Sequence, residues 1–150
     1  MIDLCDHALG RTAIRQHRFN FLLGDPGKSG RRVRLPVDAY YSELNLVIEY
    51  REIQHFQETY MDRRFTCSGM SRGEQRKVYD QRRRTDLPKY GTQVIELSFY
   101  DFEHTRGRLS RDSVRDEAII RDRLSAYLRG DVGVLEDLTS AAQAAIQLIY

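Results

Sequence analysis

The pattern of apolar and polar positions predicts a domain that mixes helices with strands. Apolar residues recur at one-turn spacing near the start, which predicts a helix over residues 3–17. Shorter apolar runs bounded by turn residues predict three strands, over residues 19–23, 33–41 and 44–50. The run Leu46-Val47-Ile48 is apolar at every position, which is typical of a strand buried on both faces.

The second half of the chain predicts three further helices and one strand. The helices are expected over residues 74–84, 112–129 and 134–149, and the strand over residues 92–99. Residues 61–73 are polar and contain glycine, so they are expected to form a loop. The order is helix, three strands, helix, strand and two helices. It predicts an α/β fold in which helices flank a mixed sheet.

Composition limits the classes to which the protein can belong. With 150 residues, of which 41% are hydrophobic and 31% charged, the chain is expected to fold as a single domain over residues 1–150. It contains no apolar run long enough for a membrane span, and its early aspartates do not suit a signal peptide. Two cysteines are too few for a disulfide framework, so we expect a reduced, cytoplasmic protein.

Positive charge is concentrated in the middle of the chain. The net charge is only +2, but residues 60–93 carry 9 basic and 4 acidic side chains. Only three of the 24 basic residues are lysines. The planar fork of arginine suits bidentate contacts with phosphate, so this basic segment favours a nucleic-acid partner. Free use of arginine codons in a GC-rich genome would give the same preference for arginine over lysine.

Two carboxylates occupy positions where acidic side chains are unusual. Asp38 lies between apolar neighbours in a predicted strand, and Glu49 follows the most apolar run of the chain. Burying an unpaired charge is costly, so both groups need partners. A hairpin would bring Asp38 and Glu49 together, where they could share a hard divalent cation such as Mg²⁺. Arginines that satisfy both carboxylates are an alternative equally consistent with the sequence.

The ordered motif around this pair resembles the PD-(D/E)xK nuclease superfamily. Pro36-Val37-Asp38 is followed, after ten residues, by Glu49-Tyr50-Arg51, and then by Gln54-His55. Among its small members, the segment is most similar to relatives of very short patch repair and homing-type endonucleases. The resemblance spans residues 19–102 and implies a restriction-endonuclease-like core, with a helical extension over residues 110–150.

The resemblance also implies roles for individual residues. Asp38 and Glu49 would bind Mg²⁺ or Mn²⁺. Arg51 stands where the superfamily normally has lysine; it can stabilise charge on a phosphate, but it does not readily give up a proton. The other catalytic candidates would bind metal, orient water or transfer a proton; they are Glu52, Gln54 and His55.

The predicted helix after this motif carries the basic segment. At helical spacing Arg76, Tyr79 and Arg83 share a face, which would bind phosphates that flank the scissile one. Arg72 and Arg82 are expected to contribute. The alternative is an ordinary solvated helix whose tyrosine lies in the core.

The sequence therefore predicts a metal-dependent endonuclease that hydrolyses phosphodiester bonds, with DNA as the expected substrate. One alternative is a nucleic-acid-binding or regulatory module that has the nuclease fold without catalysis. Another is a subunit that assembles through its C-terminal helices, as in a homodimer. No membrane partner is expected.

Overall fold

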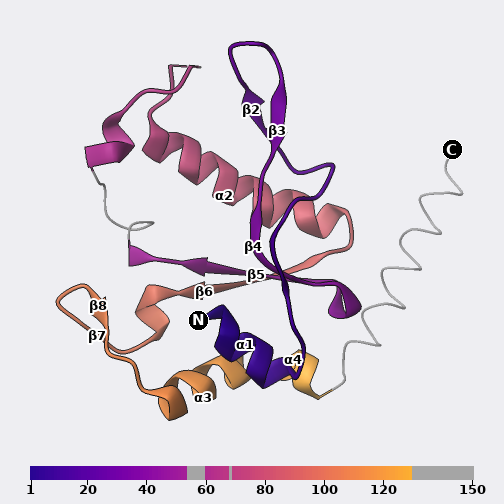
Figure 1. Ribbon diagram of the computed structural model, residues 1–150, viewed down its shortest axis with the longest axis vertical. Coiled ribbons are helices and arrows are strands. Elements are labelled where there is room, and N and C mark those ends of the chain that lie inside the picture. Colours follow the sequence, from indigo (N-terminus) through magenta and orange to yellow (C-terminus); the bar gives the residue numbers. More distant parts are fainter. Residues whose placement is uncertain (54–59, 68, 130–150) are drawn as a thin grey trace, which may run out of the picture.

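The computed structural model describes residues 1–53, 60–67 and 69–129, and a mixed four-stranded sheet lies at its centre (Figure 1). The strands follow the spatial order β1 (Ile14–His17), β4 (Val37–Tyr41), β5 (Leu46–Arg51) and β6 (Gln93–Ser98). The first two pairs are antiparallel, and β5 pairs with β6 in parallel. The long helix α2 (Arg72–Lys89) connects the parallel strands. This topology confirms the mixed α/β class.

The other elements surround this sheet. Two small hairpins pair β2 (Leu23–Pro26) with β3 (Arg32–Arg34) and β7 (His104–Thr105) with β8 (Arg108–Leu109). The remaining α-helices are α1 (Ile2–Leu9), α3 (Ser113–Arg123) and α4 (Ser125–Leu128). Three short 3₁₀ helices complete the described elements: η1 (Ser42–Leu44), η3 (Tyr60–Arg63) and η4 (Phe99–Asp101).

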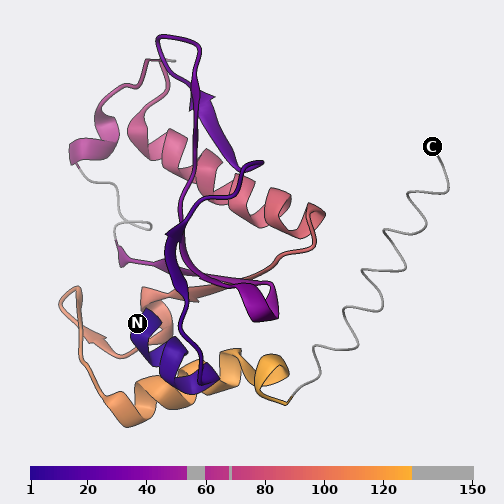
Figure 2. The same ribbon diagram turned by 45° about the vertical axis from the view of Figure 1, so that its right-hand side comes forward.

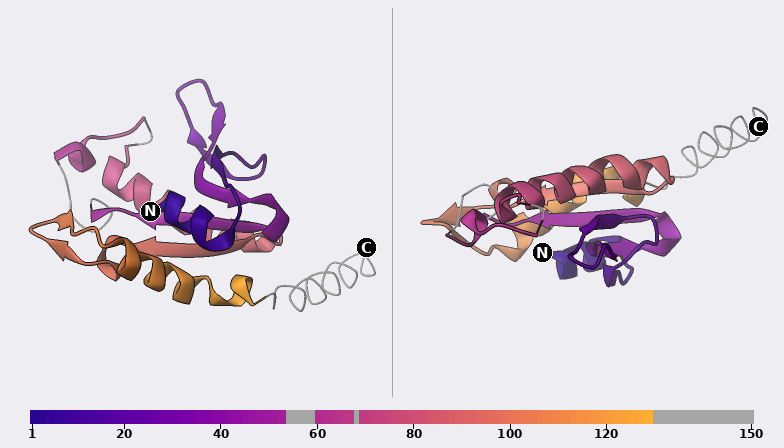
Figure 3. Two further views of the ribbon diagram at one scale, coloured as in Figure 1. Left: turned by 60° about the horizontal axis from the view of Figure 1, so that its bottom comes forward. Right: turned by 90° about the horizontal axis from the view of Figure 1, so that it is seen from above.

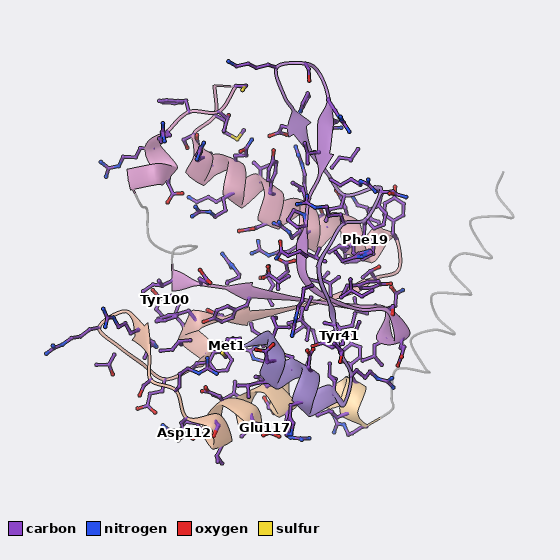
Figure 4. All side chains as sticks on the ribbon, in the orientation of Figure 1. Met1, Phe19, Tyr41, Tyr100, Asp112 and Glu117 are labelled. Carbon is purple, nitrogen blue, oxygen red and sulfur yellow. The ribbon has the colours of Figure 1, made fainter. Side chains whose placement is uncertain are left out.

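Helices cover both faces of the sheet, as the sequence predicts. Helices α1 and α3 pack against one face, where Cys5 of α1 and Ile120 of α3 belong to the same buried cluster as Ile48 of β5. Helix α2 packs against the other face, where Leu87 contacts the cluster around Val47. Figures 1 and 3 show α2 and α3 on opposite sides of the sheet. Figure 4 labels Tyr41 on the α1 side and Phe19 on the α2 side, in agreement with their clusters.

Three predicted elements match the structure closely. The predicted strands 44–50 and 92–99 correspond to β5 and β6, and the predicted helix 74–84 lies within α2. A capping box fixes the start of α2: Ser71 Oγ accepts from the backbone N–H of Glu74, and the Glu74 carboxylate accepts from the backbone N–H of Ser71. The helix therefore begins inside the segment that was expected to be a loop.

The N-terminal predictions were wrong in detail. The helix ends at Leu9, because Gly10 adopts the left-handed conformation that closes helices, and residues 14–17 form β1 instead. The predicted strand 19–23 overlaps β2 only at Leu23, and the predicted strand 33–41 is divided into β3 and β4. The break falls at Leu35-Pro36, where proline cannot donate a ladder hydrogen bond.

The C-terminal half of the prediction is partly described. The expected helix 112–129 is interrupted at Leu124, which separates α3 from α4. The predicted helix 134–149 lies outside the described residues. Within the described ranges, no helix is long and apolar enough to cross a membrane.

Candidate active site

The two candidate metal ligands meet where strands β4 and β5 diverge. The paired positions of these strands end at Ala39↔Ile48. One position further along, side-chain oxygens accept the backbone hydrogen bonds in place of carbonyl oxygens of the neighbouring strand. The backbone N–H of Asp38 donates to Glu49 Oε1 at 3.1 Å, and the backbone N–H of Tyr50 donates to Asp38 Oδ2 at 2.9 Å. The structure therefore brings the two carboxylates together across neighbouring strands, as the predicted hairpin requires.

Glu49 is largely removed from solvent, with 13% of its side chain exposed. Arg83 from α2 lies beside it, with its Nε atom 3.5 Å from Glu49 Oε2. Burial raises the pKa of Glu49 to about 7; Arg83 opposes this shift, and the negative charges of Asp38 and Asp80 add to it. Glu49 is thus a carboxylate whose charge the protein itself compensates only in part.

An open cavity of about 570 Å³ leads to this pair. Its wall combines the diverging strands with the start of α1 and the middle of α2; its lining residues include Asp3, Arg15, Gln16, Glu52, Asp80 and Arg83. Gln16 lies opposite Asp38 and places its Nε2 atom 3.5 Å from Asp38 Oδ1. Gln16 also has a positive φ of 52°, a conformation uncommon for residues other than glycine.

The donor set fits a hard divalent cation. Each carboxylate of Asp38 and Glu49 has one oxygen held by a backbone N–H, and among the described residues its other oxygen has only a 3.5 Å contact to a side-chain nitrogen. Burial is the main cause of the raised pKa of Glu49, and a cation between the carboxylates would offset the smaller contribution of repulsion from Asp38. Among the described residues no three His, Cys, Asp or Glu side chains form a metal-binding group. Two protein carboxylates nevertheless suit Mg²⁺, which commonly keeps several water ligands.

Arg51 follows Glu49 by two positions on β5 and contacts Glu96 of β6, with Arg51 Nη1 3.8 Å from Glu96 Oε2. Arg84 of α2 binds the same carboxylate at 2.7 Å. Glu96 is paired in register with Glu49, so this cluster lies beside the candidate metal site. Arg51 and Glu49 are two positions apart on β5, so their side chains leave the same face of the strand.

Of the three remaining catalytic candidates, the structure describes only Glu52. Glu52 is exposed and lines the same cavity as Asp38 and Glu49. Gln54 and His55 lie outside the described residues.

The arginines of α2 have partners within the protein. Arg76 pairs with the buried Asp62 at 2.7 Å, and Arg82 pairs with Asp25 at 2.6 Å. Arg83 donates to the carbonyl oxygen of Pro36 as well as to Asp80. These contacts give the three side chains a structural role that the sequence pattern did not reveal.

A second cavity, of about 610 Å³, adjoins the first. Arg72, Arg76, Tyr79 and Arg83 line it together, so the predicted helix face does point into one cavity. Asp80 and Arg83 line both cavities, so these two side chains of α2 lie between them. The arginine-lined cavity and the acidic pair are therefore neighbours on α2.

The structure adds residues that the sequence did not assign to the site. Asp80 stands one helical turn before Arg83 and bonds to it at 3.1 Å, and Gln16 reaches the site from β1. The spacing of Asp80 and Arg83 was a readable signal, because residues three apart are neighbours on a helix. Gln16 carried no such signal, since its strand was expected to be helical.

Comparison with protein-family models, with curated proteins and with solved structures finds no match to this chain. We therefore infer the function from the residues and their geometry.

Proposed function

We propose that the protein is a metal-dependent endonuclease that hydrolyses phosphodiester bonds in DNA. The observation that carries this proposal is the junction of Asp38 and Glu49 at the diverging ends of β4 and β5, in a cavity that shares Asp80 and Arg83 with the arginine-lined one. A solvated pair of carboxylates would need no such cavity. A glycosidase could also use two carboxylates, but the arginines beside the pair favour a phosphate substrate.

In this proposal Asp38 and Glu49 hold Mg²⁺ or Mn²⁺. Such a cation, when bound, lowers the pKa of a coordinated water and polarises the phosphate. Arg83 holds Glu49 in place through its contact at 3.5 Å and is itself fixed by Pro36 and Asp80. Arg51 stabilises negative charge on the attacked phosphate, because a planar guanidinium can donate two hydrogen bonds to phosphate oxygens.

The fold is consistent with a restriction-endonuclease-like core. The acidic pair lies on the antiparallel strands β4 and β5, and β5 continues through α2 into the parallel strand β6. The basic helix α2 thus packs directly over the strand that carries Glu49. We include this fold assignment in the proposal.

A second candidate is a DNA-binding module without catalysis. The observation that favours it is Arg51 in the lysine position, paired with Glu96. A guanidinium can neutralise a phosphate, but it does not serve as a proton donor or acceptor.

Cleavage of a fluorescent DNA duplex by single-residue variants distinguishes the endonuclease from the non-catalytic DNA-binding module. We expect Glu49→Gln and Asp38→Asn to lower the Mg²⁺-dependent cleavage rate by at least about 100-fold, because each removes a charged ligand oxygen from the site. Binding to the duplex in EDTA should not weaken, since neither substitution removes a cation that could contact a phosphate.

The matched control is Glu43→Gln, which removes a carboxylate from an exposed position paired with Arg11. This variant should cleave like the wild type. Duplex binding without cleavage by the wild type would support the second candidate. Cleavage by Glu49→Gln at the wild-type rate would contradict the assignment of the acidic pair.

A further inference from the structure

The hairpin formed by β2 and β3 stands away from the body of the protein. Figures 1 and 2 show it beyond the N-terminal half of α2, and the left view of Figure 3 shows it on the side of the sheet opposite to α3. Every residue from 26 to 34 is exposed, including Val33, which is 64% exposed. The predicted strands 19–23 and 33–41 included only the two ends of this hairpin, and the proposed catalytic site does not include it.

Helix α2 anchors the base of the hairpin firmly. Tyr79 Oη accepts from the backbone N–H of Asp25 at 2.9 Å, and Arg82 donates both to Asp25 Oδ1 and to the carbonyl oxygen of Leu23. Gly24 lies so close to Tyr79 that an added Cβ atom would be 3.1 Å from its hydroxyl oxygen. The arm therefore has a fixed direction relative to α2 and to the cavity beside it.

The arm is strongly basic. It carries four cations, and its one carboxylate, Asp25, is already paired with Arg82. Arg32 and Arg34 lie along β3, where Arg32 Nε donates to the Gly24 carbonyl oxygen and Arg34 donates to Asn20. Lys28 and Arg31 lie exposed at the tip. An uncompensated positive arm of this kind suits a polyanionic partner.

The base of the arm also forms one wall of the arginine-lined cavity. Asp25, Pro26 and Gly27 line it opposite Arg72 and Arg76. Phe65, which is 76% exposed, lines the same cavity. Arg83 lines it too and lies 3.5 Å from Glu49, so this side chain separates the cavity at the base of the arm from the acidic pair.

We infer that the β2–β3 hairpin is a binding arm for double-stranded DNA. A two-stranded ribbon fits the major groove of B-DNA, and the tip cations reach the phosphates that border the groove. The cavity at the base of the arm then receives the adjacent strand. This inference rests on the proposed function for its substrate, but it concerns binding alone and requires no catalysis.

The test measures the affinity for a fluorescent 20-base-pair duplex and for one of its single strands, in EDTA and over a series of salt concentrations. The test variant is Lys28→Gln/Arg31→Gln, which changes only exposed side chains at the tip. The matched control is Arg106→Gln/Arg108→Gln, which removes two exposed arginines from the other small hairpin. We expect the test variant to bind the duplex about tenfold more weakly and to lower the salt slope by about 1 for each lost phosphate contact, with the control unchanged.

Three results would overturn the inference: a test variant that binds the duplex like the wild type, an equal loss in the control, or an equal loss for the single strand. Hairpin-dependent binding to vesicles of anionic phospholipid, with duplex binding unaffected, would also overturn it. Because cleavage is measured separately, hairpin-dependent duplex binding by a protein that does not cleave would support the arm and contradict the nuclease. Cleavage by a protein whose duplex binding does not depend on the hairpin would support the nuclease and contradict the arm.

Discussion

At the scale of single residues, Glu49 shows how a proposed metal ligand conflicts with stability. The strand places its carboxylate under α2, with Arg83 at 3.5 Å as a cationic partner and with Asp38 and Asp80 as like charges nearby. Its pKa of about 7 means that the folded protein retains a proton that the unfolded chain releases near pH 4.5. The charged form of Glu49 therefore destabilises the fold.

This leads to a prediction on pH. Below pH 4.5 both states are protonated, so Glu49 has no effect; as the pH rises toward 7 the unfolded state loses its proton first, and the contribution of Glu49 becomes unfavourable by up to about 3 kcal/mol. We expect Glu49→Gln to unfold at a higher temperature than the wild type at pH 8, with the difference gone at pH 4.5. Thermal unfolding across this pH range measures it.

Mg²⁺ supplies the control for this prediction. If the carboxylates hold a cation, Mg²⁺ at pH 8 stabilises the wild type and leaves Glu49→Gln unchanged, because a ligand stabilises only the state that binds it. A wild type that is more stable than Glu49→Gln at pH 8 without metal would contradict the account of Glu49.

At the scale of elements, helix α2 joins the hairpin to the acidic pair. It contacts Asp62 through Arg76, Asp25 through Arg82 and Glu49 through Arg83. These ion pairs fix neighbouring segments to the helix, and Arg72, Arg76 and Arg83 also line the cavity beside it.

The bond from the Asp25 N–H to Tyr79 Oη gives a prediction for this element. Tyr79→Phe removes the acceptor and leaves the part-buried Asp25 N–H without this partner, so we expect a loss of about 1–2 kcal/mol in the free energy of unfolding. Chemical denaturation measures the loss. Tyr90→Phe is the control, because Tyr90 is 59% exposed and stacks on Phe21 through its ring. An equal loss in both variants would contradict the anchoring role.

The elements also show how far the sequence could lead. Strand β5 and helix α2 were predictable because an unbroken apolar run and a regular helical pattern are local signals. The segment 10–26 was not, because Leu9, Ala13 and His17 fit a helical spacing although Gly10 ends the helix and pairing with β4 holds residues 14–17 extended. Pairing with a distant strand determines the secondary structure of this segment, and a local sequence pattern does not show such pairing.

At the scale of the whole molecule, two cavities and one arm lie around α2. The sequence could show that Asp38 and Glu49 need partners, because it is costly to bury an unpaired carboxylate beside an apolar run. The contributions of Gln16, Asp80 and the hairpin were not predictable, because they depend on how three segments distant in the chain meet. The basic segment was visible in the sequence, whereas its internal ion pairs appear only in the folded protein.

The central claim is that this molecule uses a divalent cation to cleave DNA, and supercoiled plasmid tests it most directly. Purified wild-type protein is incubated with the plasmid in Mg²⁺ or Mn²⁺ and, in parallel, in EDTA. We predict conversion of supercoiled plasmid to nicked or linear forms in the presence of metal and none in EDTA. Intact plasmid in both metals, with the plasmid bound by the protein, would contradict the claim.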